Sequence, residues 1–69
     1  MCEAKVYLSD GEREEEIMRD VVLVQPEGDA WLLLTLLGEQ KLVRGTISRL
    51  DFLKHTVHLR QPQEPVAGS

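Results

Sequence analysis

Apolar and polar residues alternate along several short stretches of the chain, which is typical of β-strands that bury one face. In residues 2–8 the even positions are Cys, Ala, Val and Leu, whereas the odd positions are Glu, Lys and Tyr. In residues 56–60, Val57 and Leu59 alternate with polar side chains in the same way. We therefore predict strands over residues 2–8, 14–18, 30–37, 40–44, 46–50 and 56–60.

Residues that favour turns separate these stretches at fairly even intervals. They are Ser9-Asp10-Gly11, Pro26-Glu27-Gly28-Asp29, Gly38-Glu39, Arg44-Gly45 and, more weakly, Lys54-His55. Strand-length runs with turn signals every ~8–12 residues indicate a small all-β sheet or barrel, here of about 5–7 short strands. The Asp10-Gly11 pair favours a hairpin between its flanking strands, although the good helix formers in residues 12–19 leave a helix as the alternative there.

Residues 30–37 differ because they are apolar on both faces of the predicted strand. Leu32, Leu34 and Leu36 share one face, and Trp31, Leu33 and Leu37 share the other. A strand of this kind is buried on both sides. Either it lies inside a tight barrel, or the second face is covered by the partner in a homodimer.

The chain has 69 residues, which is enough for one small domain, predicted over 1–60, with a flexible Pro-containing tail over 61–69. A core of this size rarely contributes more than about 3–5 kcal/mol, so a metal or a partner subunit is expected to support the fold. The single cysteine excludes an intrachain disulfide. Eight Lys and Arg against twelve Asp and Glu give a net charge of −4, which disfavours binding to nucleic acid.

We predict a cytoplasmic protein. The sequence shows no signal-peptide pattern at its start, and its longest apolar run is far shorter than the roughly 20 residues that span a bilayer.

We predict that the protein is not an enzyme, because no nucleophile, base and orienting group are visible together. The carboxylates of Glu12, Glu14, Glu15 and Glu16 lie beside a turn and are interpreted as a solvated face. On a strand, the odd spacing of His55 and His58 places them on opposite faces, which predicts isolated surface histidines or weak metal ligands.

Cys2 is the main candidate for metal chemistry. It is either a small buried apolar residue at a strand start or, once Met1 is removed, a chain start with an α-amine and a thiol on adjacent carbons. These two groups can chelate one ion, and the backbone amide of Glu3 adds a third donor. Nitrogen and thiolate donors in a square plane favour Ni(II) or Cu(II). Two chains related by a twofold axis would complete such a site, so a homodimer sharing one metal is predicted.

Several segments of the sequence, beginning with the one that contains Cys2, resemble the sequences of the CooT family. The resemblance rests on residues 1–8, Asp10-Gly11-Glu12-Arg13-Glu14-Glu15, Met18-Arg19-Asp20-Val21, Pro26-Glu27-Gly28, Leu37-Gly38-Glu39-Gln40-Lys41, Ile47-Ser48-Arg49-Leu50-Asp51 and Thr56-Val57-His58-Leu59. It implies an SH3-like β-barrel that dimerises and binds one Ni(II) per homodimer through Cys2 of each chain. Such proteins are associated with the maturation of nickel-dependent carbon monoxide dehydrogenase.

We therefore predict a nickel-binding homodimeric accessory protein, a metallochaperone whose partners are a nickel enzyme or its maturation proteins. Its metal residues are Cys2 and the backbone amide of Glu3. The alternative is an SH3-like module that binds RNA or a partner protein and has no metal role. RNA binding is disfavoured because Tyr7, Trp31 and Phe52 are the only aromatic residues and the basic residues are dispersed.

Overall fold

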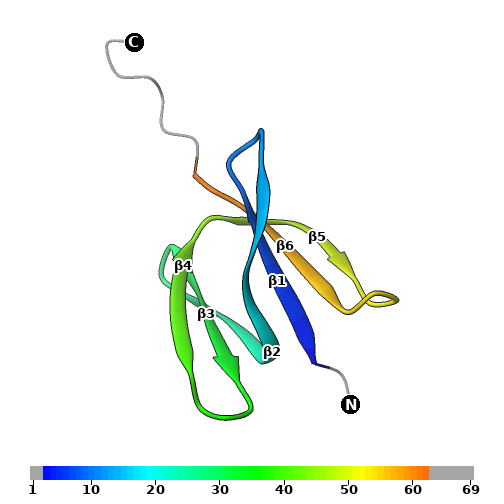
Figure 1. The fold of residues 1–69 in the computed structure, drawn as a ribbon. Helices are drawn as coiled ribbons and strands as arrows, with labels where there is room; N and C mark the ends of the chain where they lie inside the picture. The colour runs from blue at the N-terminus through cyan, green and yellow to red at the C-terminus, as the bar shows by residue number, and fades with distance from the viewer. Residues whose placement is uncertain (1–2, 63–69) are drawn as a thin grey trace.

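The protein forms a single β-sheet of six strands (Figure 1). The structure, a computed structural model, describes residues 3–62, and that range contains no helix. The strands are β1 (Ala4–Ser9), β2 (Glu14–Glu27), β3 (Ala30–Thr35), β4 (Gln40–Arg44), β5 (Thr46–Asp51) and β6 (Thr56–Arg60). The predicted all-β class and the predicted number of strands are confirmed.

The strand order is β4-β3-β2-β1-β6-β5, so the first strand lies in the middle of the sheet. β1 pairs antiparallel with β2 and parallel with β6. The long β2 serves both halves of the sheet, because its first part pairs with β1 and its second part pairs with β3. The hairpin predicted at Asp10-Gly11 is confirmed, and the helical alternative for residues 12–19 is wrong.

The core lies on one face of the sheet and follows the predicted alternation. It consists of Val6, Val21, Leu33, Val57 and Leu59, none of which is more than 8% exposed. The parallel register sets Val6 beside Val57 and Leu8 beside Leu59. Residues that lie opposite one another in the ladder bury the same face, which is how two alternating segments at opposite ends of the chain form one core.

The sheet is curled but is not closed into the predicted barrel. Its edge strands β4 and β5 are joined by Gly45 alone, and they diverge from that residue instead of pairing (Figure 1). The indole Nε1 of Trp31 donates a 3.0 Å hydrogen bond to the Gly45 carbonyl and fixes this corner. A Cβ atom at Gly45 would collide with the carbonyl oxygen of Arg60, so only glycine fits here.

Several predicted boundaries are wrong. The strand predicted over residues 14–18 continues to Glu27 as β2. The predicted strand over 30–37 ends at Thr35, and Leu36 and Leu37 form the following turn, because Gly38 at φ 96° reverses the chain. Pro26, predicted to start a turn, instead lies in β2 opposite Trp31. Within β3, Leu33 is fully buried, while Leu32 and Leu34 on the other face stay half-buried in the single chain.

Most of the predicted tail, residues 63–69, lies outside the described residues. Gln61 at its start donates its amide to the Ser9 carbonyl at 2.8 Å. In the part of the chain that the structure describes, no helix has the length and apolar character needed to cross a membrane.

Candidate metal site and the two grooves beside it

Of the two predicted metal residues, the structure describes only Glu3. Cys2 is outside the described residues, and Glu3 is exposed immediately before β1. The ladder with β2 ends at the pair Ala4 and Val21, and on the other side the Lys5 amide donates to the His55 carbonyl at 3.0 Å. Within residues 3–62 the Glu3 amide has no hydrogen-bond acceptor.

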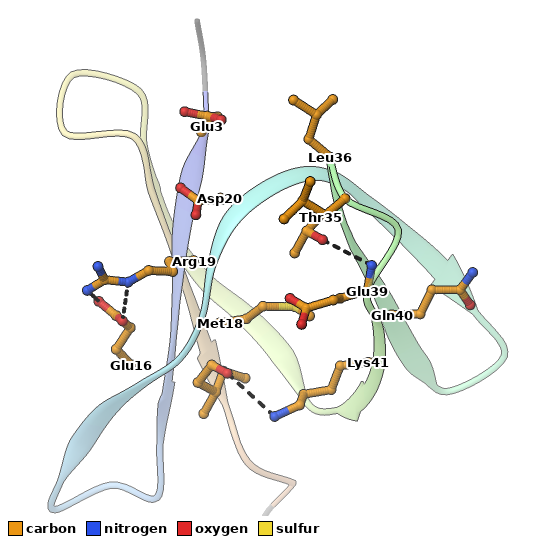
Figure 2. Close-up of a pocket in the computed structure, with 12 residues that line it drawn as sticks. Glu3, Glu16, Met18, Arg19, Asp20, Thr35, Leu36, Glu39, Gln40 and Lys41 are labelled. Carbon is orange, nitrogen blue, oxygen red and sulfur yellow. Dashed lines mark hydrogen bonds and ion pairs between the residues drawn. The ribbon is translucent and has the colours of Figure 1, made fainter.

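A bulge in β2 lies opposite this strand end. Ala4 pairs with Val21 while Val6 pairs with Met18, so β2 contains one extra residue. Asp20 accommodates it with φ 60°, a left-handed conformation that Asp tolerates better than most side chains. The bulge brings the Asp20 carboxylate to the same groove as Glu3 (Figure 2).

This groove, which we call the acidic groove, has a volume of about 940 Å³ and opens between the middle of β2 and the β3–β4 turn. Its lining residues are Glu3, Glu16, Ile17, Met18, Arg19, Asp20, Thr35, Leu36, Leu37, Glu39, Gln40 and Lys41. The leucines of the turn are strongly exposed, Leu36 at 62% and Leu37 at 92%. The turn is held by the Thr35 hydroxyl, which accepts the Glu39 amide at 3.1 Å.

Both cations of the acidic groove are engaged by neighbouring groups. Arg19 Nε pairs with Glu16 Oε2 at 2.9 Å, which lowers the pKa of the Glu16 carboxyl and raises the pKa of Arg19. Lys41 Nζ donates to the Ile17 carbonyl at 3.4 Å. Three carboxylates remain without an ion pair among residues 3–62. They belong to Glu3, Asp20 and Glu39, and they give the groove its negative charge.

A second groove lies on the other side of the strand start, and we call it the apolar groove. Its volume is about 190 Å³, and its lining residues are Ala4, Val21, Val22, Leu23, Val24, Leu50, Asp51, Phe52, His55, Thr56 and Val57. Phe52 is 80% exposed and Leu53, next to it in the β5–β6 turn, is 89% exposed. Asp51 is the only carboxylate in this lining, so the surface is close to neutral.

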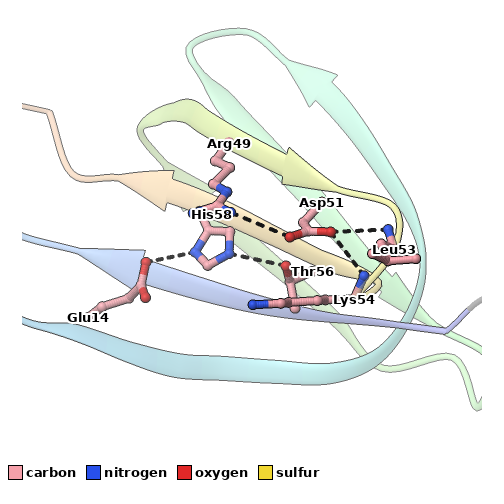
Figure 3. Close-up of polar contacts among 7 residues, drawn as sticks. All are labelled: Glu14, Arg49, Asp51, Leu53, Lys54, Thr56 and His58. Carbon is pink, nitrogen blue, oxygen red and sulfur yellow. Dashed lines mark hydrogen bonds and ion pairs between the residues drawn. The ribbon is translucent and has the colours of Figure 1, made fainter.

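The Asp51 carboxylate holds the β5–β6 turn. Its Oδ1 accepts the amides of Leu53 at 3.1 Å and Lys54 at 3.0 Å (Figure 3). The Lys54 amide, then the Leu53 amide and the Arg49 guanidinium, keep the pKa of Asp51 below its ordinary value, against a smaller opposing effect of desolvation. An ionised carboxylate therefore stabilises the turn that presents Phe52.

His58 is not the isolated surface histidine that the sequence predicted. Its Nδ1 lies 2.7 Å from Glu14 Oε2, and its Nε2 lies 3.1 Å from Thr56 Oγ1 (Figure 3). The ring stacks on Tyr7, with the centroids 5.2 Å apart. These contacts depend on the parallel pairing of β1 with β6, which no local sequence signal indicates. His55 lies in the β5–β6 turn and is exposed, as predicted.

The described residues offer no competing metal site. Within 3–62, no three side chains of His, Cys, Asp or Glu are grouped closely enough to hold an ion. The carboxylates of the β1–β2 hairpin have different surroundings. Glu14 contacts His58, Glu16 contacts Arg19, and Glu12 and Glu15 are exposed to solvent. Cys2 and the Glu3 amide therefore remain the candidate metal ligands.

Comparisons with known proteins agree with the resemblance seen in the sequence. The family described as "CO dehydrogenase accessory protein CooT" matches residues 1–60. A crystal structure described as "putative CooT from Carboxydothermus hydrogenoformans" superposes with a TM-score of 0.82 at 27% sequence identity, covering 90% of this chain and 100% of that one. A comparison with curated proteins finds no match. The chain belongs to the CooT family, whose members are accessory proteins of CO dehydrogenase and not enzymes.

Proposed function

We propose that this protein is a homodimer that binds Ni(II) as cargo and transfers it to a nickel enzyme of the carbon monoxide dehydrogenase type or to its maturation proteins. Membership of the accessory family supports the link to that enzyme. The observation that supports the metal role is the position of the Glu3 amide, which directly follows Cys2 and has no hydrogen-bond acceptor among residues 3–62.

The donor set fits a divalent ion between borderline and soft character. The Cys2 thiolate, the α-amine exposed by removal of Met1 and the Glu3 amide combine sulfur with nitrogen, which suits Ni(II). One chain supplies too few donors, so a second copy completes the set and the stoichiometry is one nickel per homodimer. Protons compete for each of these donors, so nickel affinity falls as the pH falls.

The apolar groove supports the homodimer. Val22, Leu23, Leu50 and Phe52 are each at least 39% exposed in the single chain, beside the start of β1, which directly follows the proposed metal residues. A nearly neutral apolar surface is self-complementary across a twofold axis. Covering it with a second copy brings the two strand starts to one interface. The lone Cys2 thiol stays reduced in the cytoplasm, which is the compartment we propose for this activity.

Native mass spectrometry during titration with Ni(II) tests the proposal. We expect a dimer that takes up one nickel after Met1 is removed, and we expect the Cys2→Ser variant to lose this uptake while its circular dichroism stays unchanged. His55→Asn is the matched control. It removes an exposed imidazole, a side chain able to coordinate nickel, but keeps a side chain suited to φ 57°. Full nickel affinity in Cys2→Ser would contradict the assignment of the site.

The RNA-binding alternative gains no support from the aromatic side chains. Tyr7 is stacked on His58 and the Trp31 indole is bonded to Gly45, so neither is presented as a platform for bases. Phe52 is exposed but lies among aliphatic residues of the apolar groove.

A further inference from the structure

The acidic groove is a large concave surface with an apolar floor that no residue of the described range 3–62 covers. Leu36 and Leu37 extend from the β3–β4 turn, and Met18 and Ile17 line the opposite side on β2. Exposed apolar surface of this kind, enclosed by polar residues, marks an interaction site.

The charge of the rim decides which occupant fits. The carboxylates of Glu3, Asp20 and Glu39 have no ion pair within residues 3–62, whereas Arg19 and Lys41 are already bonded to neighbours. Two copies meeting through this groove would bring like charges together, which is unfavourable at an interface. The apolar groove has no such obstacle, so the second copy is better accommodated there.

We propose that the acidic groove docks a basic amphipathic segment of the protein that accepts the nickel. Two or three apolar side chains of this segment pack against Leu36, Leu37 and Met18. Lysine or arginine residues at its ends pair with Asp20, Glu39 and Glu3 (Figure 2). The complementary charge steers the encounter, and the leucines supply most of the binding free energy.

The position of the groove explains why docking and transfer occur together. Glu3 lines the groove and follows Cys2 directly in the chain, so a docked segment lies next to the proposed nickel ligands. That the bound partner is the nickel acceptor rests on the proposed function; that the groove binds a basic amphipathic segment does not.

Fluorescence anisotropy with a synthetic peptide tests the docking. The probe is a labelled amphipathic peptide of leucines flanked by lysines, and the control peptide has glutamate in place of each lysine. We expect saturable binding of the basic peptide only. Leu37→Ser should weaken peptide binding about tenfold, because the apolar contact of the leucine that the peptide buries is lost. Leu53→Ser changes an equally exposed leucine in the β5–β6 turn and should change affinity by less than about twofold.

A second pair of variants separates local charge from the net charge of the protein. Glu39→Lys and Glu15→Lys change the net charge equally, but only Glu39 lines the acidic groove. We expect Glu39→Lys to weaken peptide binding about fivefold and Glu15→Lys to weaken it about twofold or less. Equal effects within either pair, or no binding of the basic peptide, would overturn the proposal. Conversion of the dimer to a monomer by Leu37→Ser would also overturn it, because the groove would then belong to the second copy.

The same titration distinguishes docking from metal binding. Cys2→Ser should bind the basic peptide with unchanged affinity, since the docking contacts are assigned to Leu36, Leu37, Met18 and the rim carboxylates and not to the thiol. Failure of nickel uptake with intact, groove-specific peptide binding would leave the docking surface standing and remove only the nickel role.

Discussion

The β3–β4 turn and the β5–β6 turn both present leucines to solvent beside the start of β1, yet they are surrounded by different charges. Leu36 and Leu37 line a groove with three carboxylates that have no ion pair among residues 3–62, whereas Phe52 and Leu53 adjoin a groove that is almost neutral. Exposed apolar area alone therefore does not identify the occupant of a surface. The charges around it do, because they determine whether a second copy or a basic partner is favoured.

The two turns also differ in how they are held. In the β5–β6 turn a carboxylate, Asp51, accepts two backbone amides, whereas in the β3–β4 turn the hydroxyl of Thr35 accepts the amide of Glu39. A carboxylate titrates and a hydroxyl does not over the acidic range. Protonation of Asp51 is therefore expected to loosen the β5–β6 turn, whereas the Thr35 hydroxyl that holds the β3–β4 turn is unaffected over this range.

The largest effect should come from the core that both grooves share. Leu33 is fully buried, so Leu33→Ala should lower the free energy of unfolding by about 2–5 kcal/mol and disrupt both surfaces together. Leu32→Ala is the control, since Leu32 is half-buried on the opposite face of β3, and it should cost about 1 kcal/mol. Urea denaturation measures both values. Equal losses would show that the two faces of β3 contribute alike.

Phe52→Asp should affect only the apolar groove. Placing a charge in a dimer interface leaves it desolvated and unpaired, so we expect the dimer dissociation constant to rise at least about a hundredfold. Leu37→Asp, at the other turn, should leave the dimer intact. Sedimentation velocity over a dilution series measures both. If Leu37→Asp dissociated the dimer instead, the acidic groove and not the apolar groove would be the dimer interface.

The smallest effect is the pH response of the turns. The Asp51 pKa is lower in the folded protein than in the unfolded chain, so its stabilisation is complete above about pH 4 and is lost as the pH falls through the folded pKa. Below about pH 4, amide exchange should therefore speed up at Leu53 and Lys54, relative to the intrinsic rate, but not at Glu39. Asp51→Asn, which keeps an oxygen acceptor, should remove this pH dependence. A parallel response of both turns would contradict the difference in capping.

Local sequence signals were sufficient for the strands and most of their turns. The alternation in residues 2–8 and 56–60 predicted β1 and β6, and Asp10-Gly11 predicted the first hairpin. The end of β3 was wrong because Leu36 and Leu37 continue the apolar pattern, while the chain is turned by Gly38 and the Thr35 hydroxyl. Apolar periodicity reports burial, and these two leucines are exposed.

The features of the candidate site also differ in whether the sequence could predict them. Cys2 and the Glu3 amide are predicted from donor chemistry alone, which needs only adjacent residues. The grooves could not be predicted, because the acidic groove combines the bulge of β2 with a turn that follows the next strand. The contact of His58 with Glu14 was missed for the same reason: it depends on which strands become neighbours.

The central position of β1 has a consequence for how the chain folds during synthesis. β1 is made first, but one of its two neighbours is β6, the last strand, so their parallel ladder links residues from opposite ends of the domain. Contacts between such distant segments form late and slowly. We therefore expect the strand that follows the proposed nickel ligands to reach its final place only after β6 has left the ribosome. Cargo loading would then be restricted to completed chains, without any separate checkpoint.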